Sequence, residues 1–167
     1  MATHTQETGA DASERAWMDR AITLATDSVA DGGGPFGALV VKDGEIVATG
    51  TNQVTSTLDP TAHAEVSAMR AACKELGAFS LDGCALITSC EPCPMCLAAA
   101  LWARLDRVVH CADRYDAAAA GFDDRAFHEL FDRKPRSMWP LTVERLDAPN
   151  RTAPFDAWRA AADRVGY

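Results

Sequence analysis

The chain has 167 residues, of which 48% are hydrophobic and 24% charged, and its formal net charge is −8 at pH 7. This composition is typical of one globular domain and argues against an intrinsically disordered chain. The longest apolar runs, such as CLAAALWA at 96–103, are far shorter than the roughly 20 residues of a membrane span. Because proteins that hold nucleic acid by its phosphates need clustered Lys and Arg, the acidic charge disfavours a nucleic-acid partner.

The first twelve residues are polar and lack the apolar stretch of a signal peptide, so we expect a disordered lead-in at 1–12 and a cytoplasmic location. The chain contains six cysteines, an even count that allows disulfides. Without a secretory signal, reduced thiols are the better interpretation, some of them buried and some bound to metal. We expect Cys73, Cys84 and Cys111 to be small buried hydrophobic residues.

The N-terminal part of the folded chain is predicted to be a helix followed by a β-hairpin. In residues 13–30 the apolar positions recur at helical spacing. The apolar runs at 36–41 and 45–50 flank Asp43 and Gly44, a residue pair typical of a tight turn between antiparallel strands.

The remainder alternates between helical and extended patterns with short connections, which predicts a layered α/β domain over residues 13–167. Asp59 or Thr61 is expected to cap the next helix, and Gly77 to end it. The expected elements are helices at 63–76, 96–104 and 154–167 and strands at 84–89, 107–112 and 140–146, with a less regular stretch at 113–139.

Two short motifs carry the chemistry. His63 stands two residues before Glu65, and Cys93 stands three residues before Cys96, each pair at the start of a predicted helix. A lone His-x-Glu pair is usually on the surface, and a lone Cys-x-x-Cys pair is often a redox motif or incidental. Together, His63, Cys93 and Cys96 supply the imidazole and thiolate ligands that zinc prefers. Three protein ligands indicate a catalytic site, which keeps a fourth position for water.

The order of the two motifs matches the H-x-E…P-C-x-x-C pattern of zinc deaminases, in which the glutamate carries protons and does not bind the metal. This assigns proton transfer to Glu65. The alternative is a closed structural site in which Cys90 is the fourth ligand, but then Glu65 would have no role.

Five stretches extend the likeness beyond the zinc motif. They are GGPFGALVVKDGEIVATGTN at 33–52, DPTAHAEVSAMRAACKELGA at 59–78, TSCEPCPMCLAAALWAR at 88–104, AAGFDD at 119–124 and PFDAW at 154–158. The chain resembles the cytidine deaminase superfamily and, within it, the bacterial guanine deaminases. The two C-terminal stretches are the narrower ones and indicate guanine.

The resemblance implies a three-layer α/β/α sandwich with a mixed sheet of five strands, one Zn²⁺ per chain, and a homodimer in which the C-terminal segment can cross to the partner. It also implies that Asn52 binds the purine and that Asp124 reads its exocyclic amine. The other implied substrate contacts are Phe36 and Trp102 at the ring, Ala64, the backbone near Glu91, Phe122, and Tyr167, which would close the pocket of the neighbouring chain.

Most of these roles have a structural alternative. On periodicity alone, Phe36 and Trp102 are core residues. Asn52 can serve as a turn residue, and Asp123 with Asp124 can form an N-cap. A chain end such as Tyr167 is more often disordered than functional. His110 and His128 are expected to be structural.

The leading hypothesis is a deaminase that converts guanine to xanthine and ammonia. Close alternatives are a deaminase of guanosine or another aminopurine, or of another amino-heterocycle such as an s-triazine. A tRNA adenosine deaminase is disfavoured by the net charge of −8. A zinc-stabilised module without enzymatic activity would require a fourth protein ligand.

Overall fold

The computed structural model describes residues 9–135, 138, 140, 152–160 and 162. The chain divides into two compact units, residues 1–128 and 129–167. The expectation of a single domain over 13–167 therefore stays a prediction. Along the described part of the chain, no helix combines the length and the apolar character needed to cross a membrane.

The elements follow the predicted order closely. The first helix begins at Gly9, so residues 9–12 are helical rather than part of a lead-in, while residues 1–8 lie outside the described part. The elements are α1 (Gly9–Ala30), β1 (Gly34–Lys42), β2 (Glu45–Asn52), α2 (Val54–Thr57), α3 (Ala64–Leu76), β3 (Cys84–Cys90), α4 (Pro94–Trp102), β4 (Arg107–Ala112), α5 (Arg114–Ala119), α6 (Arg125–Arg133) and α7 (Ala153–Ala160).

The sheet is mixed, with strand order β2-β1-β3-β4. β1 and β2 form the expected hairpin, and the turn between them has positive φ at Asp43 (51°) and Gly44 (85°). β3 and β4 are parallel and are joined through α4. The described residues form a four-stranded sheet rather than the expected five-stranded one. β4 is followed by α5 and α6, Pro140 lies in a bend, and residues 141–146 lie outside the described part.

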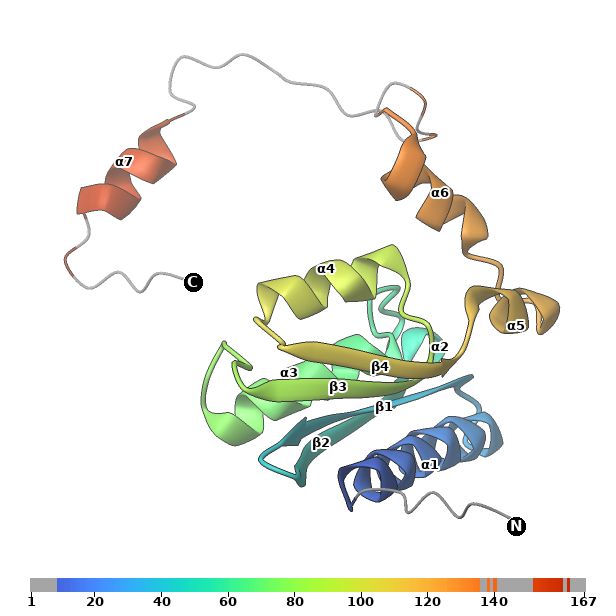
Figure 1. Cartoon of the computed structure of the whole chain (residues 1–167). Helices are drawn as coiled ribbons and strands as arrows, with labels where there is room; N and C mark the ends of the chain where they lie inside the picture. The colour runs from blue at the N-terminus through green and yellow to red at the C-terminus, as the bar shows by residue number, and fades with distance from the viewer. Residues whose placement is uncertain (1–8, 136–137, 139, 141–151, 161, 163–167) are drawn as a thin grey trace, which may run out of the picture. The chain divides into compact units, whose positions relative to one another are not determined.

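The first unit is a three-layer α/β/α sandwich, as expected. Figure 1 shows α1 on one face of the sheet and α3 and α4 on the other. Alternate residues of β1 point to opposite faces of the sheet, because successive side chains in a strand point in opposite directions. Ala38 and Val40 pack with buried residues of α3 and α4, whereas Leu39 and Val41 pack against α1.

Gly50 allows α3 to lie directly on β2. A Cβ atom at Gly50 would lie 2.4 Å from both the carbonyl oxygen of Ala64 and the backbone nitrogen of Ala68. Only glycine avoids these contacts, so the helix backbone approaches the strand as closely as packing allows. Because α3 starts next to His63 and β2 ends at Asn52, this contact sets the spacing between two predicted site residues.

Candidate active site

Two helix N-termini hold the predicted zinc ligands. His63 is the N-cap residue of α3, and Cys93 is the N-cap residue of α4. Pro94 follows Cys93 at the first helical position, where the missing N–H of proline costs no hydrogen bond. Cys96 lies in the first turn of α4 and is fully buried. The N–H groups at these helix ends favour negatively charged sulfur.

The residues before α3 form a turn of their own rather than a cap. The Asp59 carboxylate accepts hydrogen bonds from the backbone nitrogen of Thr61 (2.8 Å) and from its hydroxyl (2.6 Å). The prediction that Asp59 or Thr61 caps α3 was therefore wrong, because the helix starts later, after His63. The His63 imidazole makes no hydrogen bond to the helix N-terminus and points to the cysteines instead.

The three ligand atoms fit a tetrahedral zinc ion. His63 Nδ1 lies 3.6 Å from Cys93 Sγ and 3.5 Å from Cys96 Sγ, and the two sulfur atoms are 3.6 Å apart. Tetrahedral angles with Zn–S of about 2.3 Å and Zn–N of about 2.0 Å require separations of roughly 3.5–3.8 Å. Among the described residues, these three form the group that can hold a metal ion. Zinc is the cofactor that this set of donors fits.

The charges of the ligands also suit a cation. A hydrogen bond from the Cys96 thiol, together with the nearby His63 ring, lowers the pKa of Cys93 to about 4. The same hydrogen bond, together with burial, raises the pKa of Cys96. Thiolate is the form of cysteine that binds zinc, so the lowered pKa of Cys93 suits a metal ligand.

The other four cysteines do not belong to this group. Cys90 Sγ lies 3.6 Å from the carbonyl oxygen of Asp113, and burial raises the pKa of Cys90 to about 11. A closed site with Cys90 as the fourth ligand is therefore not supported. Cys84 is buried as expected and Cys73 is half-buried, but Cys111 is exposed and the prediction that it is buried was wrong.

Glu65 lies in the first turn of α3, directly beside the zinc ligands. Its side chain lines the same cavity as His63 and Cys93, yet the residue is only 6% exposed. Burial raises the pKa of Glu65, because a carboxylate loses hydration inside the protein. A carboxyl group with a raised pKa is suited to accept and return a proton near neutral pH.

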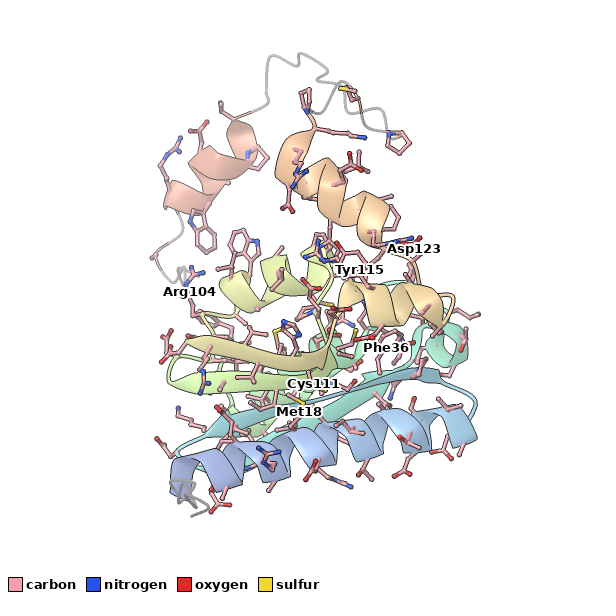
Figure 2. The ribbon with its side chains drawn as sticks, turned by 45° about the vertical axis from the view of Figure 1, so that its right-hand side comes forward. Met18, Phe36, Arg104, Cys111, Tyr115 and Asp123 are labelled. Carbon is pink, nitrogen blue, oxygen red and sulfur yellow. The ribbon has the colours of Figure 1, made fainter. Side chains whose placement is uncertain are left out.

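A cavity of about 260 Å³ opens beside the predicted zinc ligands. Figure 2 shows one of its walls, Phe36 on β1, at the end of the sheet that α5 covers. The Phe36 and Phe122 rings meet edge to face, with centroids 5.1 Å apart and an interplanar angle of 88°. Of the predicted substrate contacts, the cavity brings together Phe36, Asn52, Glu91, Phe122 and Asp124.

Asn52 lies at the cavity and also forms a turn, so the predicted contact with the purine and the turn alternative are compatible. Its side chain lines the cavity, and its Oδ1 atom accepts a hydrogen bond from the backbone nitrogen of Val54 at 3.2 Å. This turn-forming bond uses one lone pair of the amide oxygen and fixes the orientation of the amide. The amide nitrogen remains to donate to a molecule in the cavity.

Three predicted contacts are not brought to the cavity. Ala64, between His63 and Glu65 in the chain, is completely buried and is not among the residues that line the cavity. Trp102 is 67% exposed at the last residue of α4, roughly 13 Å along the helix axis from Cys93 at 1.5 Å per residue. Tyr167 lies outside the described residues.

Arg114 is a cavity residue that the sequence analysis missed. Its Nε atom and its backbone nitrogen each donate to Glu91 Oε2 at 3.0 Å, and its Nη2 atom donates to Oε1. This ion pair lowers the pKa of Glu91 to about 2. The signal that could have identified Arg114 was the parallel pairing of β3 with β4. Glu91 and Arg114 follow these two strands, and residues that follow neighbouring parallel strands meet at one edge of the sheet.

The two neighbouring aspartates of the cavity have different partners. Asp123 accepts hydrogen bonds from the backbone and the side chain of Arg125, which lower the pKa of Asp123 to about 2. Asp123 therefore stabilises the start of α6, in agreement with the capping alternative. Asp124 Oδ2 instead lies 3.3 Å from Nε2 of His128.

Comparison with known proteins agrees with this geometry. Residues 11–112 match the family described as the cytidine and deoxycytidylate deaminase zinc-binding region. The chain is 51% identical over 152 residues to the guanine deaminase of Bacillus subtilis (strain 168), covering 90% of this chain and 97% of the relative.

Solved structures show the same likeness. The X-ray structure of guanine deaminase from Bacillus subtilis has a TM-score of 0.87 and 49% sequence identity, covering 92% of this chain and 98% of that one. A crystal structure of a protein in complex with 2,6-diaminopurine has a TM-score of 0.64 and 36% identity, covering 66% and 62%. The resemblance inferred from the sequence is confirmed: the chain belongs to the cytidine and deoxycytidylate deaminase family.

Proposed function

We propose that the protein is a zinc-dependent hydrolase that converts guanine and water to xanthine and ammonia. The observation that carries the proposal is the position of Glu65, buried beside three zinc-ligand atoms and facing a cavity that also holds Asn52 and Asp124. The similarity to a guanine deaminase over 90% of the chain supports guanine as the substrate.

The size of the cavity favours a free base. Ligand pockets usually have volumes of about 300–1,000 Å³, and the cavity beside Glu65 has a volume of about 260 Å³. The edge-to-face pair of Phe36 and Phe122 offers an apolar wall for a planar ring.

The roles of the side chains follow from their positions. Bound zinc supplies a water molecule that is acidic enough to act as a nucleophile at neutral pH. Glu65 accepts one proton from the attacking water and delivers it to a ring nitrogen as the oxygen bonds to C2 of the purine. It then accepts the second proton from the hydroxyl on C2 and delivers it to the amine as the C2–N bond breaks, which leaves the C2 carbonyl of xanthine and ammonia. The Asn52 amide nitrogen donates to the purine, and the Asp124 carboxylate accepts from the 2-amino group. The products are xanthine and ammonia.

Ammonia release from guanine, guanosine, adenine, cytosine, cytidine and an amino-s-triazine tests the substrate. We expect guanine to have the highest kcat/KM. If guanosine or the triazine had a higher kcat/KM than guanine, that compound would replace guanine as the proposed substrate. Retention of tRNA at physiological salt would favour RNA editing instead, which the net charge of −8 opposes.

Glu65→Gln tests the proton carrier. This variant is expected to keep its zinc and to lose about 10²–10⁴-fold in kcat, the usual contribution of general acid–base catalysis. Glu75→Gln, an exposed change on the same helix, is the matched control and is expected to behave as wild type. A Glu65→Gln enzyme with normal turnover would show that another group moves the proton.

We further propose a cytoplasmic homodimer in which the C-terminal segment can cross to the partner. The similarity to a guanine deaminase over 90% of the chain supports a shared assembly, and the six free cysteines suit a reducing compartment. Size-exclusion chromatography with light scattering tests the dimer. A monomeric full-length protein at micromolar concentration would contradict the exchange.

A further inference from the structure

His128 is a buried histidine on α6, one turn after Asp124. The residue is 4% exposed, and its Nε2 atom is covered completely while making no hydrogen bond of good geometry within the described part of the chain. Buried polar atoms in folded proteins nearly always have a partner, so an exception needs an explanation. An apolar side chain would fill the same space without this cost.

Two acidic side chains face His128. Asp124 Oδ2 lies 3.3 Å from Nε2, and the carboxylate of Glu91 is near enough for the charge of His128 to lower the pKa of Glu91 further. Arg114 donates to both oxygens of Glu91, so Glu91 is already satisfied. Asp124 is therefore the acceptor available to His128.

Asp124 connects His128 to the cavity. The aspartate lines the cavity wall with its side chain 28% exposed, whereas the side chain of His128 is 5% exposed and lies behind it. The oxygen that faces His128 is Oδ2, which leaves Oδ1 for a molecule in the cavity. A carboxylate rotates easily about its last side-chain bond, so a donor on one oxygen fixes the direction of the other.

We propose that His128 is a positioning residue for Asp124. Its Nε2–H group donates to Asp124 Oδ2 once substrate fills the cavity, and Oδ1 is thereby held toward the 2-amino group of guanine. A small rotation of the carboxylate converts the present 3.3 Å contact into a hydrogen bond. This inference rests on the proposed function, because it concerns the amine that Asp124 accepts.

The test separates the donor from the bulk of the side chain. His128→Phe and His128→Met keep an apolar group of similar size but remove the donor. His128→Gln keeps an N–H group that can reach an aspartate one turn earlier on the helix. We expect the two donor-free variants to lose about 10–100-fold in kcat/KM for guanine, mostly in kcat, because misplaced catalytic contacts act on the transition state.

Two variants and two measurements serve as controls for this test. His128→Gln is expected to retain activity within about threefold of wild type, and all variants are expected to keep one zinc ion per chain. His110→Gln removes an exposed histidine on β4 and is expected to leave activity unchanged. Melting temperature and zinc content are measured for every variant, so that a loss of folding is recognised.

Three outcomes would overturn the proposal. Donor-free variants with kcat/KM within twofold of wild type would show that Asp124 needs no positioning. Equal losses in His128→Gln and His128→Phe would assign the effect to packing. Failure of both donor-free variants to fold, while His128→Gln folds and is active, would assign His128 to stability.

A second measurement separates this proposal from the proposed function. The dissociation constant of 2,6-diaminopurine, which also carries a 2-amino group, is measured by calorimetry for wild type and His128→Phe. If the wild-type protein releases no ammonia from guanine, the proposed function fails. Even then, weaker binding of 2,6-diaminopurine to His128→Phe than to wild type would support the positioning of Asp124. Wild type that neither binds the diaminopurine nor turns over guanine contradicts both.

Discussion

Replacement of Gly50 by alanine is expected to disturb the zinc site by pushing on the first turns of α3, the helix that follows His63. The new Cβ atom would lie 2.4 Å from the Ala64 carbonyl oxygen and from the Ala68 nitrogen, whereas ordinary contacts begin at 3.4 Å. The helix must therefore move by the difference, 3.4 − 2.4 = 1.0 Å. Because both obstructing atoms are helix backbone, we expect the upper part of the usual overpacking cost of about 1–3 kcal/mol.

The shift also reaches the metal ligands. His63 is the N-cap residue of α3, while Cys93 and Cys96 stand at the start of α4, so a movement of α3 alone changes the His63–Cys distances of 3.5–3.6 Å. Metal sites tolerate deviations of only about 0.2 Å. We therefore expect Gly50→Ala to weaken zinc binding by about 10-fold or more, in addition to lowering stability.

Gly37→Ala is the matched control. Its Cβ atom would lie 2.4 Å from the Ala21 carbonyl oxygen and 2.6 Å from the Ala25 nitrogen, both on α1 across the sheet, and α1 carries none of the zinc ligands. Thermal unfolding of the zinc-free proteins should show similar losses for both variants, whereas competition with a chromogenic chelator should show weaker zinc binding only for Gly50→Ala. Equal zinc affinity in the two variants would refute the argument.

Three further changes test the remaining parts of the site. Removal of zinc by a chelator is expected to abolish ammonia release and lower the melting temperature, both restored by added zinc, and an unchanged melting temperature would contradict a resident ion. Cys90→Ser is expected to retain one zinc ion per chain, as measured by atomic absorption. A drop in zinc content would show that Cys90 is a ligand. Phe122→Ala is expected to raise KM for guanine by about 10-fold through the lost ring contact, and an unchanged KM would remove Phe122 from the substrate site.

The cysteine half of the zinc site was predictable because its determinants are local, whereas His63, 30 residues before Cys93, was joined to it only through the known motif pattern. A cysteine at a helix N-cap and another in the first turn place both sulfurs at the same helix end whatever the rest of the fold does. The hairpin was predictable for a similar reason, because Asp43 and Gly44 adopt the positive φ values that their turn requires. In each case a few neighbouring residues fix the geometry.

The positions that the sequence analysis missed or left open depend on contacts between distant segments. Trp102 belongs to the nearly uniform apolar helix α4, whose sequence has too little polar contrast to show which side faces the cavity. Arg114 gains its role only through Glu91, which is 23 residues earlier in the chain. His128 was expected to be structural, and no sequence pattern shows that it is buried beside Asp124. Such pairings become visible only when the strands are placed side by side.

The balance of charge in the cavity indicates what kind of molecule the site accepts. Zinc and two cysteine thiolates together are neutral, Glu91 is paired with Arg114, and Asp123 is held by its own arginine. The buried carboxyl group of Glu65 and the Asp124 carboxylate, which has His128 beside one of its oxygens, remain to face a ligand in the cavity. An anionic ligand such as a nucleotide would be repelled by both, whereas a neutral ring whose edge carries N–H donors would be attracted. Guanine presents its ring N–H and its 2-amino group on one edge, so the charges left after every internal pairing match the base that the proposed reaction consumes.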